Sequence, residues 1–589
     1  MDPAANKIRA KEAESLERRL DHDALPEDIV AYHRRTKHAP TRYALGPAFL
    51  DWTSQPSPYR RFEGAPLTLL PLLMDRPTPA FPGPAPKPAA LDKAALGLFF
   101  ELAFGLSAWK SLDGSTWALR NNPSSGNLHP TEAYALLDSL EGLNAVAALW
   151  HYAPLEHGLE TRAVFSERHV LPEGGFLLGL SAIPWREAWK YGERAYRYCQ
   201  LDAGHAIGAA AMAAAALGWR AFLLPEPSDA ETAELLGLDR ADASHRWEVE
   251  HPDALLWIDV GGEDAPPLDL AALLALPRRW FGAANRLSED HDPWPAVDRA
   301  AALCRKPRSD SCARVEARSV ETLDHAAFRR SRLNAENVID SKNLERALRE
   351  RPASTFSHRA LAPLPEIGAV VRRRRSAQRM DGKTVAPLES FRLMLAATLP
   401  GAEPLLSGFS FRPRVNLLIF AHRVEGLAPG LYILERDASS AARLRETMGE
   451  FDTSPVALSG LRLSLLRSGD CQREATIFSC RQALAGKGCF AVAMIAEFDR
   501  TLAQEGAFAY RRLHWEAGLI GQALYLWACA LGLSGTGIGC FFDDEVHALL
   551  GLAPQETRFQ TLYHFTVGGA VEDARLLTLP PYPDSRRGP

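Results

Sequence analysis

The sequence contains a basic run that ends in a hydroxyl, Arg372 to Ser376, and a glycine-rich turn, Gly535 to Gly539. Guanidinium groups pair with phosphate oxygens, and the basic run stands before a predicted helix whose N-terminal N–H groups also suit a phosphate. A glycine backbone can approach a flat ligand and offer it N–H groups. After the last predicted strand stand Asp573 and Arg575, and this arginine could be a second cation for the phosphate. These residues predict a site for a phosphate and a flat ligand.

A fourth candidate is a loop whose hydroxyls, amide and exposed backbone could line the polar edge of a ring: Pro123, Ser124, Ser125, Gly126 and Asn127. Each candidate also has an ordinary structural interpretation. The basic run could be a solvated loop, and the glycines could cap the preceding helix. The aspartate and arginine could form a surface pair, and the PSSGN loop could be a plain turn.

An internal duplication relates distant parts of the chain. Lys190 to Leu238 aligns with Gln504 to Leu552 without a gap, at a separation of 314 residues, and 17 of the 49 positions are identical. The matches include an AYR triplet, an Ala-Gly pair and a closing LLGL, so a high alanine content does not explain them. We therefore predict two repeats of about 250 residues each.

The predicted organisation has four parts. Residues 1–90 form a leader that begins with a charged helix and wraps the first repeat; ten prolines between positions 56 and 88 interrupt regular structure there. Residues 91–275 form repeat 1, and residues 366–589 form repeat 2. Between them, residues 276–365 are a polar linker or arm with a short helix near 344–349.

Each repeat combines one long apolar helix with several strands. The helices, Leu201 to Trp219 and His514 to Leu533, are apolar on all sides, which is typical of helices buried in an interior. The clearest strands are predicted at residues 131–137, 255–262, 415–421 and 562–569. This mixture indicates an α+β fold with three layers, α/β/α, in each repeat.

Composition and charge narrow the class of protein. The chain is 47% hydrophobic and 24% charged, as in ordinary globular proteins, and its net charge of −5 argues against nucleic-acid binding. The start of the chain does not read as a signal peptide, and we predict no membrane span. The eight cysteines form no CxxC pair, so we expect reduced thiols, no bound metal and a cytoplasmic location.

The order of these features resembles a known family. A basic run ending in serine, an apolar helix that enters a glycine turn, and an arginine after the last strand resemble the FMN-dependent nitroreductase superfamily. Further segments are similar to its SagB-type dehydrogenase branch: YHRRTKHAPTRYA, PSSGNLHP, KYGERAYRY, VEGLAPGLY and VGGAVEDARL. Together the matching segments cover most of both repeats and much of the leader.

The resemblance implies two tandem nitroreductase-like repeats that form an intramolecular pseudo-dimer, with FMN at their interface. Repeat 1 would contribute the PSSGN loop, and repeat 2 the phosphate cations and the backbone that faces flavin N5. The residues implied in repeat 2 are Arg374, Arg375, Ser376, Arg379, Thr536, Gly537, Ile538, Gly539 and Arg575. The second arginine of the family pattern RRSxR falls on Gln378 here, with Arg379 one position later.

The two implied sites are unequal. Repeat 1 has Pro225 at the position of Gly539, and proline has no N–H to donate. It has Leu268 at the position of Arg575 and no basic run before its first helix. Repeat 2 reads LLSGFSFRPRV at 405–415 in place of a PSSGN loop. We therefore predict that one FMN binds per chain.

The predicted function is an FMN-dependent oxidoreductase that transfers hydride at flavin N5. Lys190 and Tyr191 resemble the Lys-Tyr motif of the azoline dehydrogenases in the SagB-type branch, so they are candidate catalytic groups for proton transfer; packing at a helix start is the alternative. The substrate would be a small molecule or a peptide, such as a peptide-derived heterocycle, with NAD(P)H or O₂ as co-substrate. Two other functions stay open: an NAD(P)H-dependent nitro or quinone reductase, and a flavin-free scaffold that holds a peptide or a partner enzyme.

Overall fold

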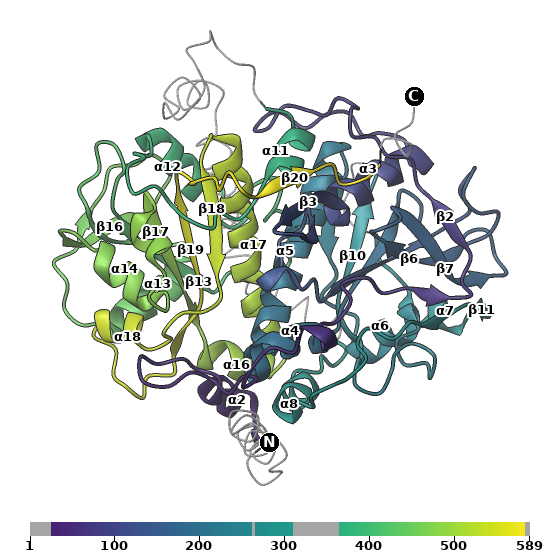
Figure 1. The fold of residues 1–589 in the computed structure, drawn as a ribbon, viewed down its shortest axis with the longest axis horizontal. Coiled ribbons are helices and arrows are strands. Elements are labelled where there is room, and N and C mark those ends of the chain that lie inside the picture. Colours follow the sequence, from purple (N-terminus) through teal and green to yellow (C-terminus); the bar gives the residue numbers. More distant parts are fainter. Residues whose placement is uncertain (1–24, 262–265, 310–364, 584–589) are drawn as a thin grey trace.

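Two antiparallel sheets with the same strand order form the two halves of the molecule (Figure 1). The computed structural model describes residues 25–261, 266–309 and 365–583. The sheet of repeat 1 has the order β11 (Arg278–Trp280), β7 (Gly158–Phe165), β6 (Ala148–Ala153), β5 (Thr131–Leu137), β8 (Gly175–Ala182), β10 (His251–Asp259) and β9 (Arg220–Leu223); its edge strand β11 comes from the predicted linker. The order in repeat 2 is β15 (Ser454–Pro455), β16 (Leu463–Ser468), β14 (Gly430–Leu434), β13 (Val415–Ala421), β17 (Phe490–Glu497), β19 (Phe559–Gly568) and β18 (Ser534–Ile538). Each strand has a counterpart in the other sheet, which confirms two copies of one fold.

The middle strand β13 shows how a sheet separates two layers of helices. Leu417 and Ile419 face the large core that the sheet shares with α17 (Ala509–Ala530). Leu418 and Phe420 face a second core cluster, to which α13 (Ala438–Thr447) and α18 (Glu545–Leu549) contribute. Alternate side chains of a strand point to opposite faces, so the sheet lies between helices on both sides. The predicted three-layer α/β/α arrangement is confirmed.

The predicted strands are found, with differences at their starts. β5 and β13 have the predicted bounds, because both are mainly apolar runs whose residues are all buried; their polar members are Thr131, Glu132 and Asn416. β10 and β19 begin at His251 and Phe559, before the predicted starts at residues 255 and 562. Their first residues include polar side chains, which the apolar pattern did not count.

The two long helices begin earlier than predicted. The structure has α5 (Ala195–Ala216) and α17 in place of helices at 201–219 and 514–533. Their first turns carry Arg197 and Arg511, which interrupt the apolar pattern, but both arginines are buried. Each is paired with a carboxylate of the other repeat, and pairing is what makes a buried charge tolerable.

The two long helices cross at a pair of glycines that are 314 residues apart. A Cβ atom on Gly204 would lie 2.3 Å from a carbonyl oxygen of α17, and one on Gly518 would lie 2.2 Å from a carbonyl oxygen of α5. Only glycine permits so close a crossing. Near the start of the same helices, Tyr196 and Tyr510 stack with ring centroids 6.5 Å apart and planes at 8°. Because equivalent residues meet each other, the crossing lies on a pseudo-two-fold axis.

Two ion pairs repeat the same symmetry. Arg197 of repeat 1 binds Asp543 of repeat 2 at 2.6 Å, and Arg511 of repeat 2 binds Asp229 of repeat 1 at 2.5 Å. The two aspartates are also 314 residues apart. Such exchange of equivalent contacts is the pattern of an isologous dimer, so the intramolecular pseudo-dimer is confirmed.

The leader and the C-terminal end of repeat 2 tie the two halves together. In α2 (Ile29–Arg35) of the leader, the Tyr32 hydroxyl donates to a carbonyl oxygen of repeat 1, and His33 contacts Gln560 of repeat 2 at 3.1 Å. Near the C-terminus, β20 (Leu577–Leu579) pairs with β3 (Leu106–Leu112) of repeat 1, which pairs with β4 (Ser115–Arg120).

The leader and the predicted linker also pack on repeat 1. β1 (Phe62–Glu63) pairs with β12 (Ala283–Ala284), and β2 (Leu67–Leu69) pairs with β7. The helices predicted in residues 1–20 and 344–349 lie outside the described residues.

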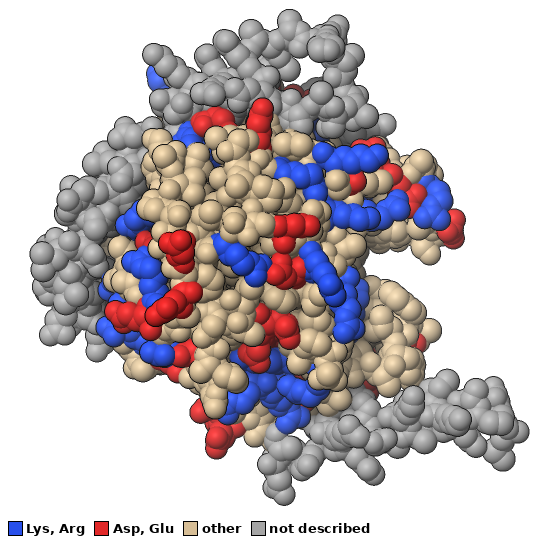
Figure 2. Space-filling model, turned by 90° about the vertical axis from the view of Figure 1, so that its left-hand side faces the viewer, with Lys and Arg blue, Asp and Glu red and all other residues tan. Residues whose placement is uncertain are grey.

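The remaining described helices complete the layers around the sheets. They are α3 (Lys93–Phe104), α4 (Pro184–Tyr191), α6 (Asp229–Leu236), α7 (Leu270–Ala275), α8 (Pro295–Leu303), α11 (Ile367–Arg373), α12 (Leu388–Ala396), α14 (Gln472–Phe478), α15 (Ala483–Lys487) and α16 (Asp499–Glu505). None of the helices in the described ranges combines the length and apolar character needed to cross a membrane. Basic and acidic side chains are interspersed on the side of repeat 2 (Figure 2).

Candidate active site

A cavity of about 1600 Å³ is lined by residues of both repeats. Most of the residues singled out from the sequence lie on its wall: Pro123, Ser124, Ser125, Gly126, Asn127, Tyr191, Arg374, Arg375, Ser376, Thr536, Gly537, Ile538 and Gly539. Lys190, Arg379 and Arg575 are not among its lining residues. The tertiary structure therefore brings together segments that are more than 400 positions apart in the chain.

The basic run is positioned by a strand rather than by a helix N-terminus. The helix predicted after Pro387 is confirmed as α12, which begins at Leu388, but residues 377–387 separate it from Ser376, so its N-terminus does not directly follow the basic run. Ser376 instead forms a parallel bridge with Gly535, and its hydroxyl lies 2.8 Å from the hydroxyl of Tyr525. The edge strand of repeat 2 thus holds the serine in place.

Two consecutive arginines, Arg374 and Arg375, lie at this end of the cavity. Arg374 is buried and donates to the carbonyl oxygen of Arg120 at 3.2 Å; burial lowers its pKa. Arg375 donates to the carbonyl oxygens of Arg374 at 2.7 Å and Ser107 at 2.9 Å, and burial together with Arg374 lowers its pKa to about 10. Among the described residues, Arg374 and Arg375 have no ion pair with a carboxylate, and Nε of Arg374 has no hydrogen-bond partner. The guanidinium of Arg120 instead donates to the carbonyl oxygen of Pro58 and lies over the ring of Tyr59. This end of the cavity therefore carries positive charge that the protein does not neutralise.

The predicted glycine turn is an edge strand, β18, paired with β19. The N–H of Gly537 donates to the hydroxyl of Tyr525 at 2.8 Å. A Cβ atom on Gly537 would lie 1.8 Å from the hydroxyl of Tyr563, and one on Gly539 would lie 2.4 Å from the ring of Tyr198. Glycine is needed because an extended backbone runs directly against these aromatic side chains on the cavity wall.

The PSSGN loop is held by a buried carboxylate of α5. The N–H of Ser125 donates to both oxygens of Asp202 at 3.0 Å, and the Ser125 hydroxyl donates at 2.9 Å. Gly126 and Asn127 adopt left-handed φ angles of 61° and 62°. Burial raises the pKa of Asp202 to about 7, although the hydrogen bonds of Ser124 and Ser125 oppose this shift. Asp202 lines the cavity, so a carboxyl group that changes charge near neutral pH borders the site.

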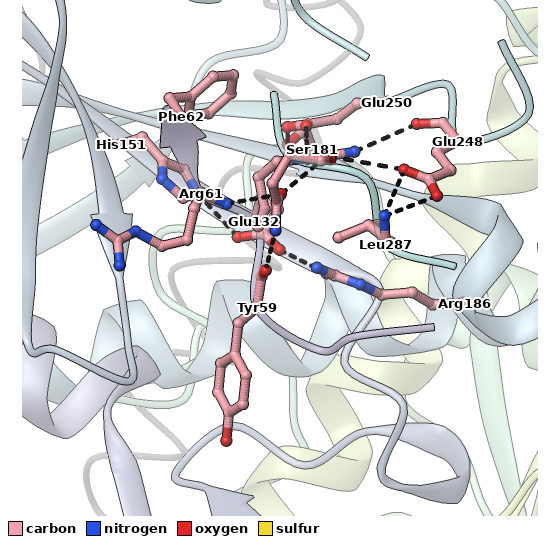
Figure 3. Close-up of polar contacts among 12 residues, drawn as sticks. Tyr59, Arg61, Phe62, Glu132, His151, Ser181, Arg186, Glu248, Glu250 and Leu287 are labelled. Atoms are coloured by element: carbon pink, nitrogen blue, oxygen red, sulfur yellow. Dashed lines mark hydrogen bonds and ion pairs between the residues drawn. The ribbon is translucent and has the colours of Figure 1, made fainter. Parts of the chain in front are cut away.

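A buried ionic cluster supports the far side of this loop (Figure 3). Arg186 donates to the carbonyl oxygen of His129 at 2.7 Å and to Glu132 at 2.5 Å. His151 lies between Glu132 and Glu160, 3.0 Å from each; burial lowers its pKa, but the two carboxylates outweigh burial and raise it. The side chain of Arg61 in the leader lies 2.7 Å from Glu160, so the cluster also fastens the leader to the loop.

The candidate catalytic pair lies at the C-terminal end of α4, against the same loop. A Cβ atom on Gly126 would lie 2.5 Å from the hydroxyl of Tyr191 and 3.2 Å from Nζ of Lys190. The Tyr191 ring packs edge-on against Tyr198, with centroids 4.6 Å apart. Burial raises the pKa of Tyr191 well above its ordinary value. The pair is therefore beside the cavity, with the tyrosine on its wall and the lysine directly behind the loop.

Arg379 and Arg575 do not line the cavity with Arg374 and Arg375. The Arg575 side chain is 74% exposed and pairs with Asp573 at 2.7 Å. Arg379 is exposed, and its carbonyl oxygen accepts the N–H of Val571 at 2.9 Å. Asp573 lines the cavity, so the segment that carries Arg575 borders the site although its guanidinium faces solvent.

The pseudo-equivalent position is closed by direct contact between the repeats. Leu223 of β9 is the counterpart of Gly537, and its N–H donates to the carbonyl oxygen of Gly408 at 3.1 Å. The Ser410 hydroxyl donates to the carbonyl oxygen of Leu223 at 2.9 Å. A Cβ atom on Gly408 would lie 1.7 Å from the carbonyl oxygen of Ala221. The loop of repeat 2 thus packs on β9 where the PSSGN loop stands apart from β18.

Sequence reasoning missed several residues of the cavity wall: Arg120, Asp202, Tyr198, His205, Tyr525 and Tyr563. Asp202 and His205 stand in the segment LDAGH, where two polar residues interrupt an otherwise apolar helix. That interruption was a usable signal, because a buried polar residue needs a partner or a role. Tyr525 and Tyr563 lie in apolar runs that read simply as core, so no local signal marked them.

A family model and a solved structure match this chain. The model described as the nitroreductase family matches residues 87–248 and 444–569, one region in each repeat. A crystal structure from Anabaena variabilis, provisionally assigned as a nitroreductase, has a TM-score of 0.62 and 21% sequence identity, and the match covers 92% of this chain and all of the other. These matches identify both repeats as nitroreductase folds.

Two further matches are more limited. A protein of Methanocaldococcus jannaschii, also provisionally assigned as a nitroreductase, is 36% identical over 55 residues, which are 9% of this chain and 28% of the relative's length. The Escherichia coli microcin synthetase McbBCD complex with truncated pro-MccB17 matches with 19% identity and a TM-score of 0.24, covering 45% of this chain and 95% of the other. Similarity at this level does not indicate function.

Proposed function

We propose that this pair of nitroreductase folds is a flavin-dependent oxidoreductase of the SagB-type dehydrogenase kind, with one FMN in the cavity between the repeats. The observation that carries the proposal is the pair of Arg374, which is buried, and Arg375, which is half-buried, at one end of the cavity; among the described residues neither arginine has a carboxylate partner. Positive charge removed from water without a counter-ion is costly, so the group calls for a bound anion. A phosphate matches guanidinium geometry.

The remainder of the wall fits the ring system of a flavin. The glycine backbone of β18 approaches Tyr198 and Tyr563 so closely that a Cβ atom at Gly537 or Gly539 would meet their side chains. The cavity volume of about 1600 Å³ exceeds the usual range of a single ligand pocket, which is about 300–1,000 Å³. Room for a substrate therefore remains beside the cofactor. When bound, FMN would supply hydride transfer at its N5 atom.

The residues have distinct proposed roles. Arg374, Arg375 and Ser376 hold the phosphate, and the hydroxyl of Tyr525 orients Ser376 and Gly537 relative to each other. The PSSGN loop of repeat 1 covers the opposite side of the ligand. Oxidation of a ring carbon releases a proton as well as a hydride, and Lys190 or Tyr191 takes part in the transfer of that proton beside Gly126. Because the raised pKa of Tyr191 keeps its phenol protonated, the tyrosine would relay the proton rather than hold it.

The proposed substrate is a small molecule or a peptide-derived heterocycle, oxidised with O₂ as the final electron acceptor. An NAD(P)H-dependent nitro or quinone reductase is the runner-up, and a flavin-free scaffold is the alternative outside enzymes. Flavin absorbance of the purified protein, with FMN quantified after denaturation, tests the cofactor. We expect one FMN per chain; colourless protein that takes up no added FMN would favour the scaffold.

Turnover assays distinguish the proposed dehydrogenase from the alternative NAD(P)H-dependent reductase. O₂-dependent turnover without NAD(P)H would support the dehydrogenase, and NAD(P)H consumption with a quinone would support the reductase. The Lys190→Ala and Tyr191→Phe variants should lower turnover. They should leave the FMN content unchanged, because neither residue contacts Arg374 or Arg375, the proposed phosphate cations. Normal rates in both variants would assign these residues to packing.

A further inference from the structure

A three-stranded sheet outside the two large sheets forms one wall of the cavity. It consists of β20 of repeat 2 and the hairpin β3–β4 of repeat 1, with β3 in the middle. In repeat 1 this hairpin lies between α3 and β5, directly before the PSSGN loop. The corresponding interval of repeat 2, between α12 and β13, is described throughout and contains no strand. The hairpin is therefore a feature of repeat 1 that the duplicated half does not share.

One cross-strand row of this sheet faces the cavity. Thr578 of β20 pairs with Lys110 of β3, and Lys110 pairs with Trp117 of β4. All three residues line the cavity. Side chains directly opposite each other lie on the same face of a sheet, with Cβ atoms about 4.5–5.5 Å apart. A hydroxyl, an ammonium group and an indole ring therefore stand side by side on the cavity wall.

Lys110 and Thr578 present two neighbouring hydrogen-bond donors. Nζ of Lys110 donates to Oγ1 of Thr578 at 2.6 Å. Because the hydroxyl oxygen accepts this bond, its own proton is available to a second acceptor, and the ammonium group has two more N–H groups. Two donor atoms this close together suit a carboxylate, which accepts hydrogen bonds on both of its oxygens.

No carboxylate among the described residues forms an ion pair with Lys110, which is half-buried. Glu572 also lines the cavity, but it is exposed and lies beyond ion-pair distance of the lysine. Asp573 is paired with Arg575 at 2.7 Å. Burial lowers the pKa of Lys110, as does the charge of Arg375, and Glu572 opposes both. A ligand anion would therefore meet a positive charge that the protein leaves without a close partner.

Lys110 is separate from the two arginines that the proposed function assigns to the phosphate. Arg375 donates to the carbonyl oxygen of Ser107 at 2.9 Å, and Ser107 stands three positions before Lys110 on β3. Three positions of a strand span about 10 Å. The ammonium group is thus a second positive point, further along the same wall.

Trp117 supplies a flat apolar surface next to this charge. Within the described ranges, its half-buried ring has no aromatic partner and its N–H has no acceptor. Leu119 lies two positions later on β4, on the same face, and also lines the cavity. An aromatic ring of a ligand gains stability by stacking on such a side chain. The wall therefore combines a place for a ring with a place for an anion.

We propose that Lys110, Trp117 and Thr578 form a substrate subsite for an aromatic or heteroaromatic carboxylate. The ring of the ligand stacks on Trp117, and its carboxylate accepts hydrogen bonds from Lys110 and Thr578. That the ligand is a substrate rests on the proposed function, whereas its binding depends only on this wall. The acid is either a free small molecule or the last residue of a peptide, because both present the same carboxylate.

The test titrates the purified full-length protein with two probes, 2-phenylthiazole-4-carboxylate and the neutral 2-phenylthiazole-4-carboxamide. Isothermal titration calorimetry measures both affinities, with and without added FMN. We expect the carboxylate to bind at least about tenfold more tightly than the carboxamide, which is the effect of one charged hydrogen bond. Equal affinities of the wild type for the two probes would overturn the proposal.

Variants separate the roles of charge and ring. Lys110→Met keeps the length of the side chain and removes its charge, so the preference for the carboxylate should disappear. Trp117→Ala should weaken the binding of both probes at least about fivefold, because both lose the stacking surface. Lys87→Met and Trp247→Ala are the matched controls, since both residues are exposed and lie outside the cavity, and they should behave as the wild type. A preference that survives in Lys110→Met would contradict the assignment.

A second pair of probes distinguishes the two sources of the acid. It consists of a glycine tripeptide that ends in thiazole-4-carboxylate and of the same peptide with a terminal carboxamide. If the peptide acid binds as tightly as the small acid and the peptide amide does not, the subsite takes the end of a peptide. If the small acid binds and neither peptide does, it takes a free acid.

Titrations with FMN and riboflavin keep this subsite separate from the proposed phosphate site. Lys110→Met should bind both flavins as tightly as the wild type, since riboflavin lacks the phosphate and Lys110 does not contact it in FMN. A loss of affinity for FMN alone would make Lys110 a phosphate ligand and overturn the subsite. A carboxylate preference in protein that binds no FMN would support the subsite and contradict the flavin proposal, and FMN binding without that preference would do the reverse.

Discussion

The two pseudo-equivalent positions of the molecule are built from the same elements, yet one is open and the other is closed. At the open position, β18 and the PSSGN loop stand on either side of the cavity. At the closed position, β9 and the loop around Gly408 are hydrogen-bonded to each other. In an ordinary two-fold homodimer both subunits have the same sequence, so the two sites are identical. In a duplicated chain each repeat has its own sequence, so the two sites can differ. The comparison shows that one site can be lost without loss of the fold, because protein backbone fills the space.

The same comparison applies to one carboxylate on each long helix. Asp202 and Glu516 are equivalent positions, and both accept hydrogen bonds from the loop of their own repeat. Glu516 is paired with the buried Arg436 at 2.5 Å. Asp202 instead receives only the hydrogen bonds of the serine loop, and burial raises its pKa. The closed position is thus neutralised internally, whereas the open position keeps a carboxyl group that titrates.

The largest effect is expected from reversing the charge at the open position. Arg374→Glu removes a buried donor and adds a charge that repels phosphate. Each lost charged hydrogen bond costs about 1.5–3 kcal/mol, so FMN affinity should fall by at least about 100-fold. Isothermal titration of flavin-free protein with FMN measures the change. The control is Arg462→Glu, at an exposed arginine of repeat 2 outside the cavity; equal affinity in both variants would contradict the assignment.

The two carboxylates should respond differently to neutralisation. Glu516→Gln leaves Arg436 buried without its charge partner and should lower the free energy of unfolding by about 3–5 kcal/mol. Asp202→Asn leaves no buried cation unpaired. At acidic pH it should therefore lower the free energy of unfolding by less than Glu516→Gln does. Denaturant unfolding of the two variants measures both values. Equal losses of unfolding free energy in the two variants at pH 5 would contradict the claim that only Glu516 neutralises a buried cation.

The Asp202 variant should also change the pH dependence of stability. Burial raises the pKa of the Asp202 carboxyl in the folded state to about 7. At a pH below the pKa of the unfolded state, the carboxyl is protonated in both the folded and the unfolded protein. At a pH between the two pKa values, it is protonated only in the folded protein. The wild type therefore loses unfolding free energy as pH rises towards 7, by as much as about 4 kcal/mol from this group. Asparagine does not titrate. The stability of Asp202→Asn relative to the wild type should rise between pH 5 and pH 8, and a constant difference would contradict the shift.

Two glycine variants compare the open and closed positions directly. Gly537→Ala would push Tyr563 into the cavity and should weaken FMN binding about tenfold, while the fold tolerates the added methyl. Gly408→Ala would force the loop off β9, at a cost of about 1–3 kcal/mol in unfolding free energy, and should leave FMN binding unchanged. Thermal unfolding and FMN titration of both variants test the pair. A second FMN bound by Gly408→Ala would show that loop contact alone closes that position.

The smallest effect is expected from Arg575→Ala. The Arg575 guanidinium is largely exposed and already paired with Asp573, and such surface pairs contribute little. FMN affinity should change by less than about threefold. A loss as large as that of Arg374→Glu would show that the segment 570–576 closes over the phosphate when FMN binds, which would restore the role that the resemblance implies for Arg575.

Much of the architecture could be predicted because it rests on local pattern and on the repeat. The mainly apolar runs of β5 and β13 determine their own bounds, and the repeat at a separation of 314 residues correctly predicts two copies of one fold. That Gly204 meets Gly518 and that Tyr196 meets Tyr510 is shown only by the structure. The sequence also predicts that the two repeats differ in their binding residues, since Pro225 of repeat 1 aligns with Gly539 of repeat 2. A proline has no backbone N–H to donate, and a position without arginine has no guanidinium, whatever the fold. The sequence alone therefore predicts these two losses.

Other features depended on the tertiary structure. Arg120, Asp202 and Cys540 carry no local signal for a shared role, and they border one cavity only because two repeats enclose it. Whether a polar group is partnered, charged or accessible is a property of its neighbours in space. The sequence by itself therefore determined which residues were available and that the halves differ, and only the folded chain decided which side chains are buried together and so what their charges and reactivity are.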